Sequence, residues 1–101
     1  MKYEFNCSGE MFEWRGPAPF YFVKVDSTQS ALIKERAQML SYGWGVVHIH
    51  GKVNGQNFQS ALIPKDGCYY IPIKDSIRKA QDLMVGDRLK VHFNLGKPTN
   101  L

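Results

Sequence analysis

The chain has 101 residues, of which 44% are hydrophobic and 22% are charged. This length fits one domain, and the composition is that of a globular protein, which excludes a disordered or collagen-like chain. Thirteen lysines and arginines against nine acidic residues give a net charge of +4, which permits an anionic partner without requiring one. We therefore expect a single domain over residues 1–101.

No apolar run approaches the roughly 20 residues of a membrane span, and the N-terminal residues lack the apolar segment of a cleaved signal peptide. Cys7 and Cys68 are too few for a disulfide scaffold, and their spacing is not that of a metal site. We expect a cytoplasmic protein with two free thiols and no membrane association, although a disulfide between the two cysteines stays open.

Two strands, a helix and a third strand are predicted in the first part of the chain. Asp26 is a good N-cap, and Gln29 stands three residues later, where a capping box places it. Ile33, Ala37 and Leu40 then follow at helical spacing. A segment rich in proline and glycine, residues 15–19, separates the first two strands. The predicted strands are 3–14, 20–25 and 46–53, and the predicted helix is 27–40.

The same order repeats after Asn54-Gly55, which is a strong hairpin-turn signal. Asp75 is expected to cap a second helix that carries Ile77, Ala80 and Met84 on one apolar stripe and closes at residues 86–87. The predicted strands are 56–63, 68–73 and 88–95, with a tight turn at 64–67 and a tail at 96–101.

The chain thus reads as β-β-α-β twice, with halves at about 1–53 and 54–95. Each half is too short to bury its own sheet face, so we expect the two halves to close one small barrel around a pseudo-twofold axis. The predicted fold class is mostly β with two helices.

Two resemblances agree with this fold. Residues 70–80 and 85–91 resemble the swapped-hairpin unit of AbrB and MazE-type regulators, which follows an IP-K-x-I-R … GD-x-L-x-V pattern. The whole chain is similar to a small bacterial family catalogued as domain of unknown function 1905, through residues 14–19, 41–45, 64–67 and 78–80 with Tyr70, Pro72, Gly86 and Asp87. These resemblances imply a double-split β-barrel. The AbrB-type unit implies DNA binding by a dimer, whereas the second family has no settled activity.

Aromatic and charged residues of the irregular segments are the first candidate site. An arginine that stacks on a tryptophan or tyrosine beside a rigid loop can hold a planar or anionic ligand. The alternative is that these rings fill the ends of the barrel. The candidate ligand-binding residues are Trp14, Arg15, Tyr42, Trp44, Lys65 and Asp66.

Basic residues of the second half form a competing site. Clustered on one face they could contact phosphates, but acidic residues such as Asp75 and Asp87 are interleaved with them. The candidate nucleic-acid residues are Lys74, Arg78, Lys79 and Arg88.

Metal binding and catalysis have weaker signals. His48 and His50 share one face of a strand, and His92 is the repeat equivalent of His50, but no further ligand motif flanks them. No phosphate loop or nucleophile elbow is present, and Cys68 has no histidine nearby in sequence. We expect no cofactor, no metal and no enzyme activity.

The sequence therefore predicts a non-enzymatic module that binds a small molecule or a protein partner, as a monomer or weak homodimer. The alternative is a DNA-binding regulator or antitoxin-like protein of the AbrB/MazE kind.

Overall fold

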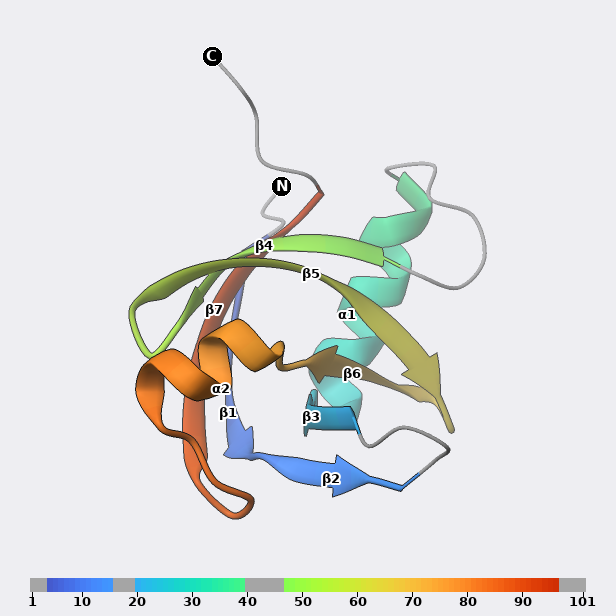
Figure 1. Ribbon diagram of the computed structural model, residues 1–101. Coiled ribbons are helices and arrows are strands. Elements are labelled where there is room, and N and C mark those ends of the chain that lie inside the picture. The colour runs from blue at the N-terminus through green and yellow to red at the C-terminus, as the bar shows by residue number, and fades with distance from the viewer. Residues whose placement is uncertain (1–3, 16–19, 40–46, 97–101) are drawn as a thin grey trace.

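The computed structural model describes residues 4–15, 20–39 and 47–96, and its fold is mostly β with two helices, as predicted (Figure 1). Tyr42, Trp44 and the tail after Gly96 lie outside the described residues. The strands are β1 (Glu4–Glu10), β2 (Phe12–Trp14), β3 (Phe20–Lys24), β4 (Val47–Val53), β5 (Gln56–Lys65), β6 (Cys68–Pro72) and β7 (Arg88–Leu95). The helices are α1 (Ser27–Met39) and α2 (Asp75–Gln81).

All seven strands pair antiparallel in one sheet, in the order β1-β7-β4-β5-β6-β3-β2. β1 and β2 stand at opposite edges of this order, yet Met11 alone separates them in the chain. The sheet must therefore curl until its two edges meet, which gives the barrel-like shape in Figure 1.

The bend at Met11 corrects the prediction of one continuous strand over 3–14. The side chain of Met11 is buried, and its N–H donates to the carbonyl of Asp87 at 2.8 Å. Its own carbonyl accepts from the N–H of Gly86 at 2.9 Å. These two bonds pair the N–H and carbonyl of Met11 at the point where the chain stops pairing with β7 and begins to pair with β3.

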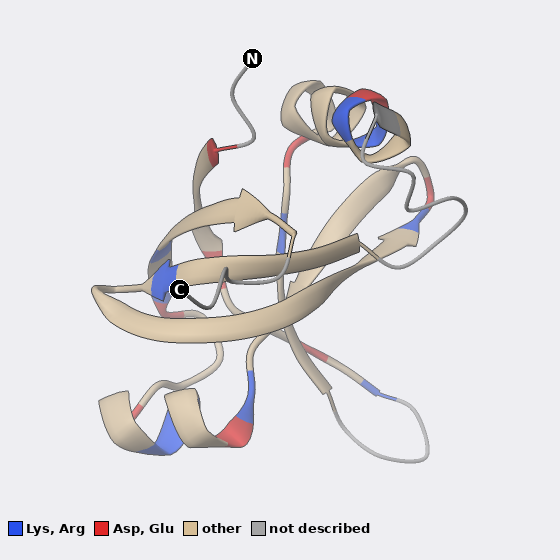
Figure 2. Ribbon diagram, turned by 90° about the horizontal axis from the view of Figure 1, so that it is seen from above, with Lys and Arg blue, Asp and Glu red and all other residues tan. Residues whose placement is uncertain are grey.

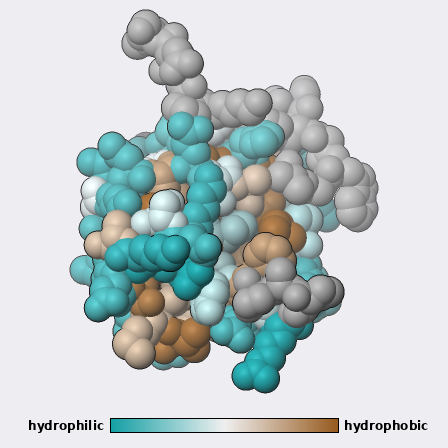
Figure 3. Space-filling model, in the orientation of Figure 1, coloured by the Kyte–Doolittle hydropathy of each residue, from teal (hydrophilic) through white to brown (hydrophobic). Residues whose placement is uncertain are grey.

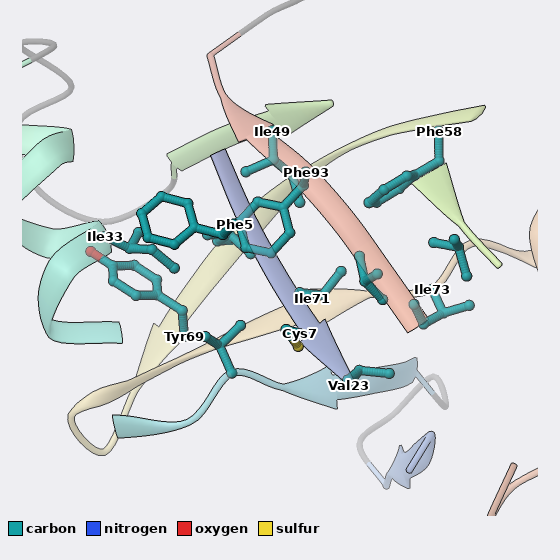
Figure 4. Packing of buried hydrophobic residues seen from close by; sticks show 14 of the residues in the cluster. Phe5, Cys7, Val23, Ile33, Ile49, Phe58, Tyr69, Ile71, Ile73 and Phe93 are labelled. Atoms are coloured by element: carbon teal, nitrogen blue, oxygen red, sulfur yellow. The ribbon is translucent and has the colours of Figure 1, made fainter. Parts of the chain in front are cut away.

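The core lies inside the curl and is built from alternate residues of every long strand (Figure 4). The rings of Phe5 and Phe93 stack with their centroids 5.6 Å apart, which ties β1 to β7. Helix α1 adds Ile33 and Ala37, both buried at the predicted helical spacing. One hydrophobic cluster therefore joins both halves of the chain.

Helix α1 begins as predicted. The N–H of Gln29 donates to Oδ1 of Asp26 at 2.8 Å, and its side-chain amide donates to Oδ2 at 2.9 Å. The buried hydroxyl of Ser30 then accepts from the N–H of Tyr69 at 3.0 Å and donates to the carbonyl of Val25 at 3.1 Å. The cap fixes the start of α1, and Ser30 fixes the helix to β6 and to the residue after β3.

Helix α2 differs from its prediction at both ends. The N-cap residue is Lys74, and Asp75 is the first helical residue, whose carboxylate pairs with Arg78. The helix ends when Asp82 adopts a left-handed φ of 54°, so Met84 is not helical and is 70% exposed. The predicted stripe is wrong except at Ile77, because Ala80 is also exposed.

The turn between β5 and β6 is shorter than predicted. β5 runs through Pro64 to Lys65, which leaves a two-residue turn, Asp66-Gly67, with φ of 53° and 80°. Asn54-Gly55 has nearly the same values, 48° and 86°. Both hairpins therefore use the two-residue turn with two positive φ angles, whose twist matches that of the strands.

Within the described ranges, neither helix has the length and apolar character needed to span a lipid bilayer.

Candidate functional site

Five aromatic side chains gather on the outward side of β2, β3 and β6, and we call them the aromatic face. The register places Phe12 opposite Phe22 and Trp14 opposite Phe20. Phe22 is only 6% exposed, yet it lies outside the hydrophobic core cluster, so its neighbours on the outward side bury it. The aromatic face consists of Phe12, Trp14, Phe20, Phe22 and Tyr70.

Phe22 is the centre of this cluster. Its ring centroid lies 6.1 Å from that of Phe12, 6.0 Å from Trp14 and 6.3 Å from Tyr70. The contacts with Trp14 and Tyr70 are edge-on, a geometry worth about 0.5–1.5 kcal/mol per pair beyond burial. Phe20 lies at the rim and is 59% exposed. Contacts between its rings thus hold the face together, while Phe20 leaves apolar surface exposed.

Lys65 adds a cation to the aromatic face. Its Nζ lies 3.0 Å from the centroid of the Trp14 ring, within cation–π range. Lys65 is the last residue of β5, and Trp14 is the last residue of β2, so only the curled sheet brings them together. The structure therefore joins two of the residues that the sequence proposed for one site, although Trp14 stands on a strand and not in a loop.

Of the other proposed ligand-binding residues, Arg15 and Asp66 belong to the described part of the chain, whereas Tyr42 and Trp44 do not. The Arg15 side chain is 92% exposed, and its Nε lies 3.5 Å from a carboxylate oxygen of Glu13. Asp66 is exposed in the hairpin turn beside Lys65.

Sequence reasoning missed four rings of the aromatic face: Phe12, Phe20, Phe22 and Tyr70. A usable signal was present, because Phe12 and Trp14 are two residues apart, as are Phe20 and Phe22. Two-residue spacing puts each pair on one face of its strand. The spacing does not say whether such a pair faces the core or the outside. On β3 the core side is taken by Val23, so Phe22, the residue before it, faces outward.

The basic residues proposed for nucleic acid surround α2. The guanidinium carbon of Arg78 lies 3.8 Å from the centroid of the Tyr21 ring, and the same group pairs with Asp75. Lys74 and Lys79 are exposed at the start and in the last turn of this helix. Arg88 begins β7 and is exposed. Both helices carry acidic residues next to basic ones (Figure 2), so their charge is mixed.

The histidines lie on the outward sides of β4 and β7. Nδ1 of His50 lies 2.8 Å from the carbonyl oxygen of Gly96, and Nδ1 of His92 lies 2.7 Å from Oδ1 of Asn6. Over the described part of the chain, no three His, Cys, Asp or Glu residues are grouped to hold a metal ion.

Both cysteines are free thiols that line one hollow of about 360 Å³ together with Asp26. Burial raises the pKa of the Cys7 thiol, and the Asp26 carboxylate raises it further. A thiol with a raised pKa is a weak nucleophile at neutral pH. The Cys7 environment therefore favours a structural role.

The chain matches the family described as "Domain of unknown function (DUF1905)" over residues 8–93, which is well over half of its length. It therefore belongs to this family, as the sequence resemblance predicted. No curated protein matches the sequence. The family description assigns no activity, so the function has to be argued from the surface of the molecule.

Proposed function

We propose that this member of the DUF1905 family is a non-enzymatic binding domain, and that its aromatic face docks a segment of a partner protein. The segment presents an apolar side chain flanked by acidic residues. The observation that carries the proposal is the set of five packed rings on the outward side of the sheet, with the Lys65 ammonium 3.0 Å from the Trp14 ring centroid.

The position of these rings is the reason why we expect the partner segment to present an apolar side chain. The outward face of an antiparallel sheet is normally polar, whereas here aromatic residues occupy it on three strands. Tryptophan and tyrosine are enriched at the centres of protein interfaces. The rings fill the space between one another, so the face suits a protein segment better than a small molecule, which needs a concave site. Figure 3 shows one side of the molecule, where hydrophobic patches alternate with hydrophilic surface.

The cations beside the rings are the reason why we expect acidic residues in the partner segment. Lys65 lies over Trp14, and Lys24 is opposite Tyr70 in the register and is exposed. Arg15 follows Trp14 directly. Carboxylates of the partner would meet these groups at the rim, where charges mainly raise the association rate and select the partner.

Selection from a random displayed-peptide library tests the proposal on the full chain. We expect the selected peptides to carry an aromatic or leucine residue flanked by aspartate or glutamate. Phe20→Ser should weaken their binding at least about tenfold, because loss of a hot-spot side chain costs about 2 kcal/mol or more and a tenfold change corresponds to about 1.4 kcal/mol. Lys65→Glu should shift the selection from acidic toward basic peptides.

Met84→Ser is the matched control, because Met84 is also an exposed apolar residue but stands in the turn before β7. It should leave peptide binding unchanged. Peptides that bind Phe20→Ser and wild type equally, or a selection that enriches no sequence, would refute the proposal.

The competing DNA-binding regulator would need the cations of α2 and Arg88 as a phosphate-contacting face. Arg78 is already held by Tyr21 and Asp75, and acidic residues interrupt the remaining charge. This arrangement favours the aromatic face. Binding of duplex DNA that is lost in a Lys79→Gln, Arg88→Gln variant would reverse the preference.

We infer further that the curled sheet is a double-split β-barrel of two β-β-α-β halves. Strand pairing supports this, because exchanging β1 and its continuation β2 with β5, β3 with β6 and β4 with β7 turns every pairing into a pairing of the same sheet. For example, β1–β7 becomes β5–β4, and β2, which continues β1, pairs with β3 as β5 pairs with β6. An experimental structure whose halves do not superpose strand on strand would contradict this architecture.

A further inference from the structure

We infer that the outward side of β1, β7, β4 and β5 is a second binding site, which takes a single-stranded nucleic acid. It is separate from the aromatic face and uses none of its rings, so it does not depend on the proposed docking of a protein segment. It shares Lys74 with the expected DNA-binding residues but does not use Arg78, Lys79 or Arg88.

Strand register builds this site from residues that are far apart in the sequence. Outward-pointing side chains of the four strands form two rows across the sheet. One row consists of Asn6, His92, Lys52 and Asn57. The other consists of Glu4, Asn94, His50 and Gln59.

Three hollows join along these rows, with volumes of about 580, 770 and 480 Å³. The first and second share Lys52 and His92, and the second and third share Gln59 and Lys74. We call their combined lining the polar track. It runs from Asn6 on β1 to the end of β6.

The charge of the polar track has one sign. Its lining includes three lysines, Lys52, Lys74 and Lys90, and no aspartate or glutamate. Glu4 stands at the end of one row, where Oε1 lies 3.8 Å from Nε2 of His92. This face therefore holds three lysines in linked hollows, and none of them forms an ion pair with a carboxylate of the described residues. Such a face attracts a polyanion.

Several track residues are held in position before any ligand binds. The Asn54 side chain accepts from the N–H of Lys90 at 2.9 Å, and its amide donates to Gln81 at 3.0 Å. His92 is held by Asn6, and His50 by the carbonyl of Gly96. Groups fixed in this way lose little entropy on binding.

The chemistry and length of the track select the ligand. Lysines neutralise phosphates, while amides and imidazoles can contact the edges and faces of unpaired bases. Adjacent strands are about 4.8 Å apart, so the track spans about 14 Å between β1 and β5 before it continues to β6. This span exceeds a single phosphate group and fits a chain of nucleotides, with the lysines as phosphate contacts.

Fluorescence anisotropy with labelled single-stranded DNA and RNA of about 12 nucleotides tests the inference on the full chain. We expect binding at about 50 mM salt that weakens steeply by about 200 mM. In a Lys52→Gln, Lys90→Gln variant the fall of log affinity with log salt should be shallower by about 1.4. The reason is that each phosphate contact on a single strand releases about 0.7 counterions, and the variant loses two contacts. Both side chains are exposed, so the variant should fold normally.

The matched control is Lys24→Gln, Lys34→Gln, which removes the same charge from exposed positions outside the track. It should keep the slope within about 0.3 of wild type, and Phe20→Ser should keep the affinity. The inference fails if neither oligonucleotide binds at about 50 mM salt, or if the control lowers the slope as much as the track variant. It also fails if inorganic polyphosphate of equal charge displaces the oligonucleotides as well as they displace each other, because the amides and imidazoles then add nothing.

Discussion

The aromatic face and the polar track are two outward sides of one curled sheet, and they enclose the same core. On the aromatic face, side chains pack against each other until Phe22 is as inaccessible as a core residue. On the polar track, lysines, imidazoles and amides line linked hollows. The inward sides of both regions are alike, so the two surfaces differ only in what stands at the outward positions.

Strand β5 contributes to both regions and shows the change along a single strand. Its outward residues pass from Asn57, Gln59 and Ile63, which line the track, to Lys65, which lies over Trp14. The inward residues Phe58 and Leu62 are buried throughout. One strand can therefore serve two surfaces of different chemistry, because its alternation separates the core from the face.

The largest expected effect is on the free energy of unfolding, which should fall more when an inward-facing ring is removed than when an outward-facing ring is removed. Phe93→Ala should lower the free energy of unfolding by about 3–5 kcal/mol, because it leaves a cavity in the core. Phe22→Ala should cost about 2 kcal/mol, since the outward cluster can collapse or admit water. Urea unfolding of both variants measures the difference. Equal costs would mean that the aromatic face is a structural part of the core and not a free surface.

An intermediate effect is expected at the backbone beneath the polar track. A Cβ at Gly51 would collide with the carbonyl oxygen of His92 and the Cα of Phe93, so β4 and β7 would have to separate. Gly51→Ala should lower the free energy of unfolding by about 3 kcal/mol and weaken oligonucleotide binding, while selected peptides still bind the folded fraction.

The matched control for that variant is Gly9→Ala, whose Cβ would lie 3.2 Å from a methyl carbon of the Val23 side chain. A side chain can move where a backbone cannot, so we expect a cost of about 1 kcal/mol or less. If denaturation gave equal costs for the two glycines, the close approach of β4 and β7 would not be a constraint on the track.

The smallest effect concerns the start of α1, away from both surfaces. Asp26→Ala should lower the free energy of unfolding by about 1 kcal/mol at neutral pH, because the N-cap bonds to Gln29 are lost. Those bonds hold the pKa of Asp26 below its usual value of 3.8. The stabilisation is therefore present above that pH and is lost as the pH falls through the lowered pKa of the folded state.

Unfolding curves of wild type and Asp26→Ala should thus converge in acid. Peptide and oligonucleotide binding at neutral pH should stay unchanged in this variant. A gap that widened below pH 3.8 would contradict the cap assignment.

Local patterns were enough to predict the order of the elements. The Asn54-Gly55 turn, the Asp26 cap and the buried positions Ile33 and Ala37 of α1 depend on neighbours within a few residues, and all three are confirmed. The errors arose where a distant contact decided the local structure. Met11 bends its strand where it meets Gly86 and Asp87, and α2 stops at Asp82, before Met84 could join an apolar stripe.

The candidate sites divide in the same way. The sequence identified Trp14 and Lys65 as unusual residues, because a ring and a cation near irregular segments are recognisable types. Their contact depends on the pairing of β5 with β6, of β6 with β3 and of β3 with β2 in the curled sheet, which no local pattern encodes.

By itself, the sequence determined a mostly β domain with two helices and its membership in a family, since alternation, turns and caps are short-range properties. Only the tertiary structure decided that Phe22 faces outward while Val23 faces inward, and that Lys52, Lys74 and Lys90 line connected hollows. The physical reason is that a two-residue period fixes which side chains share a face, but closure of the sheet decides which face becomes the core.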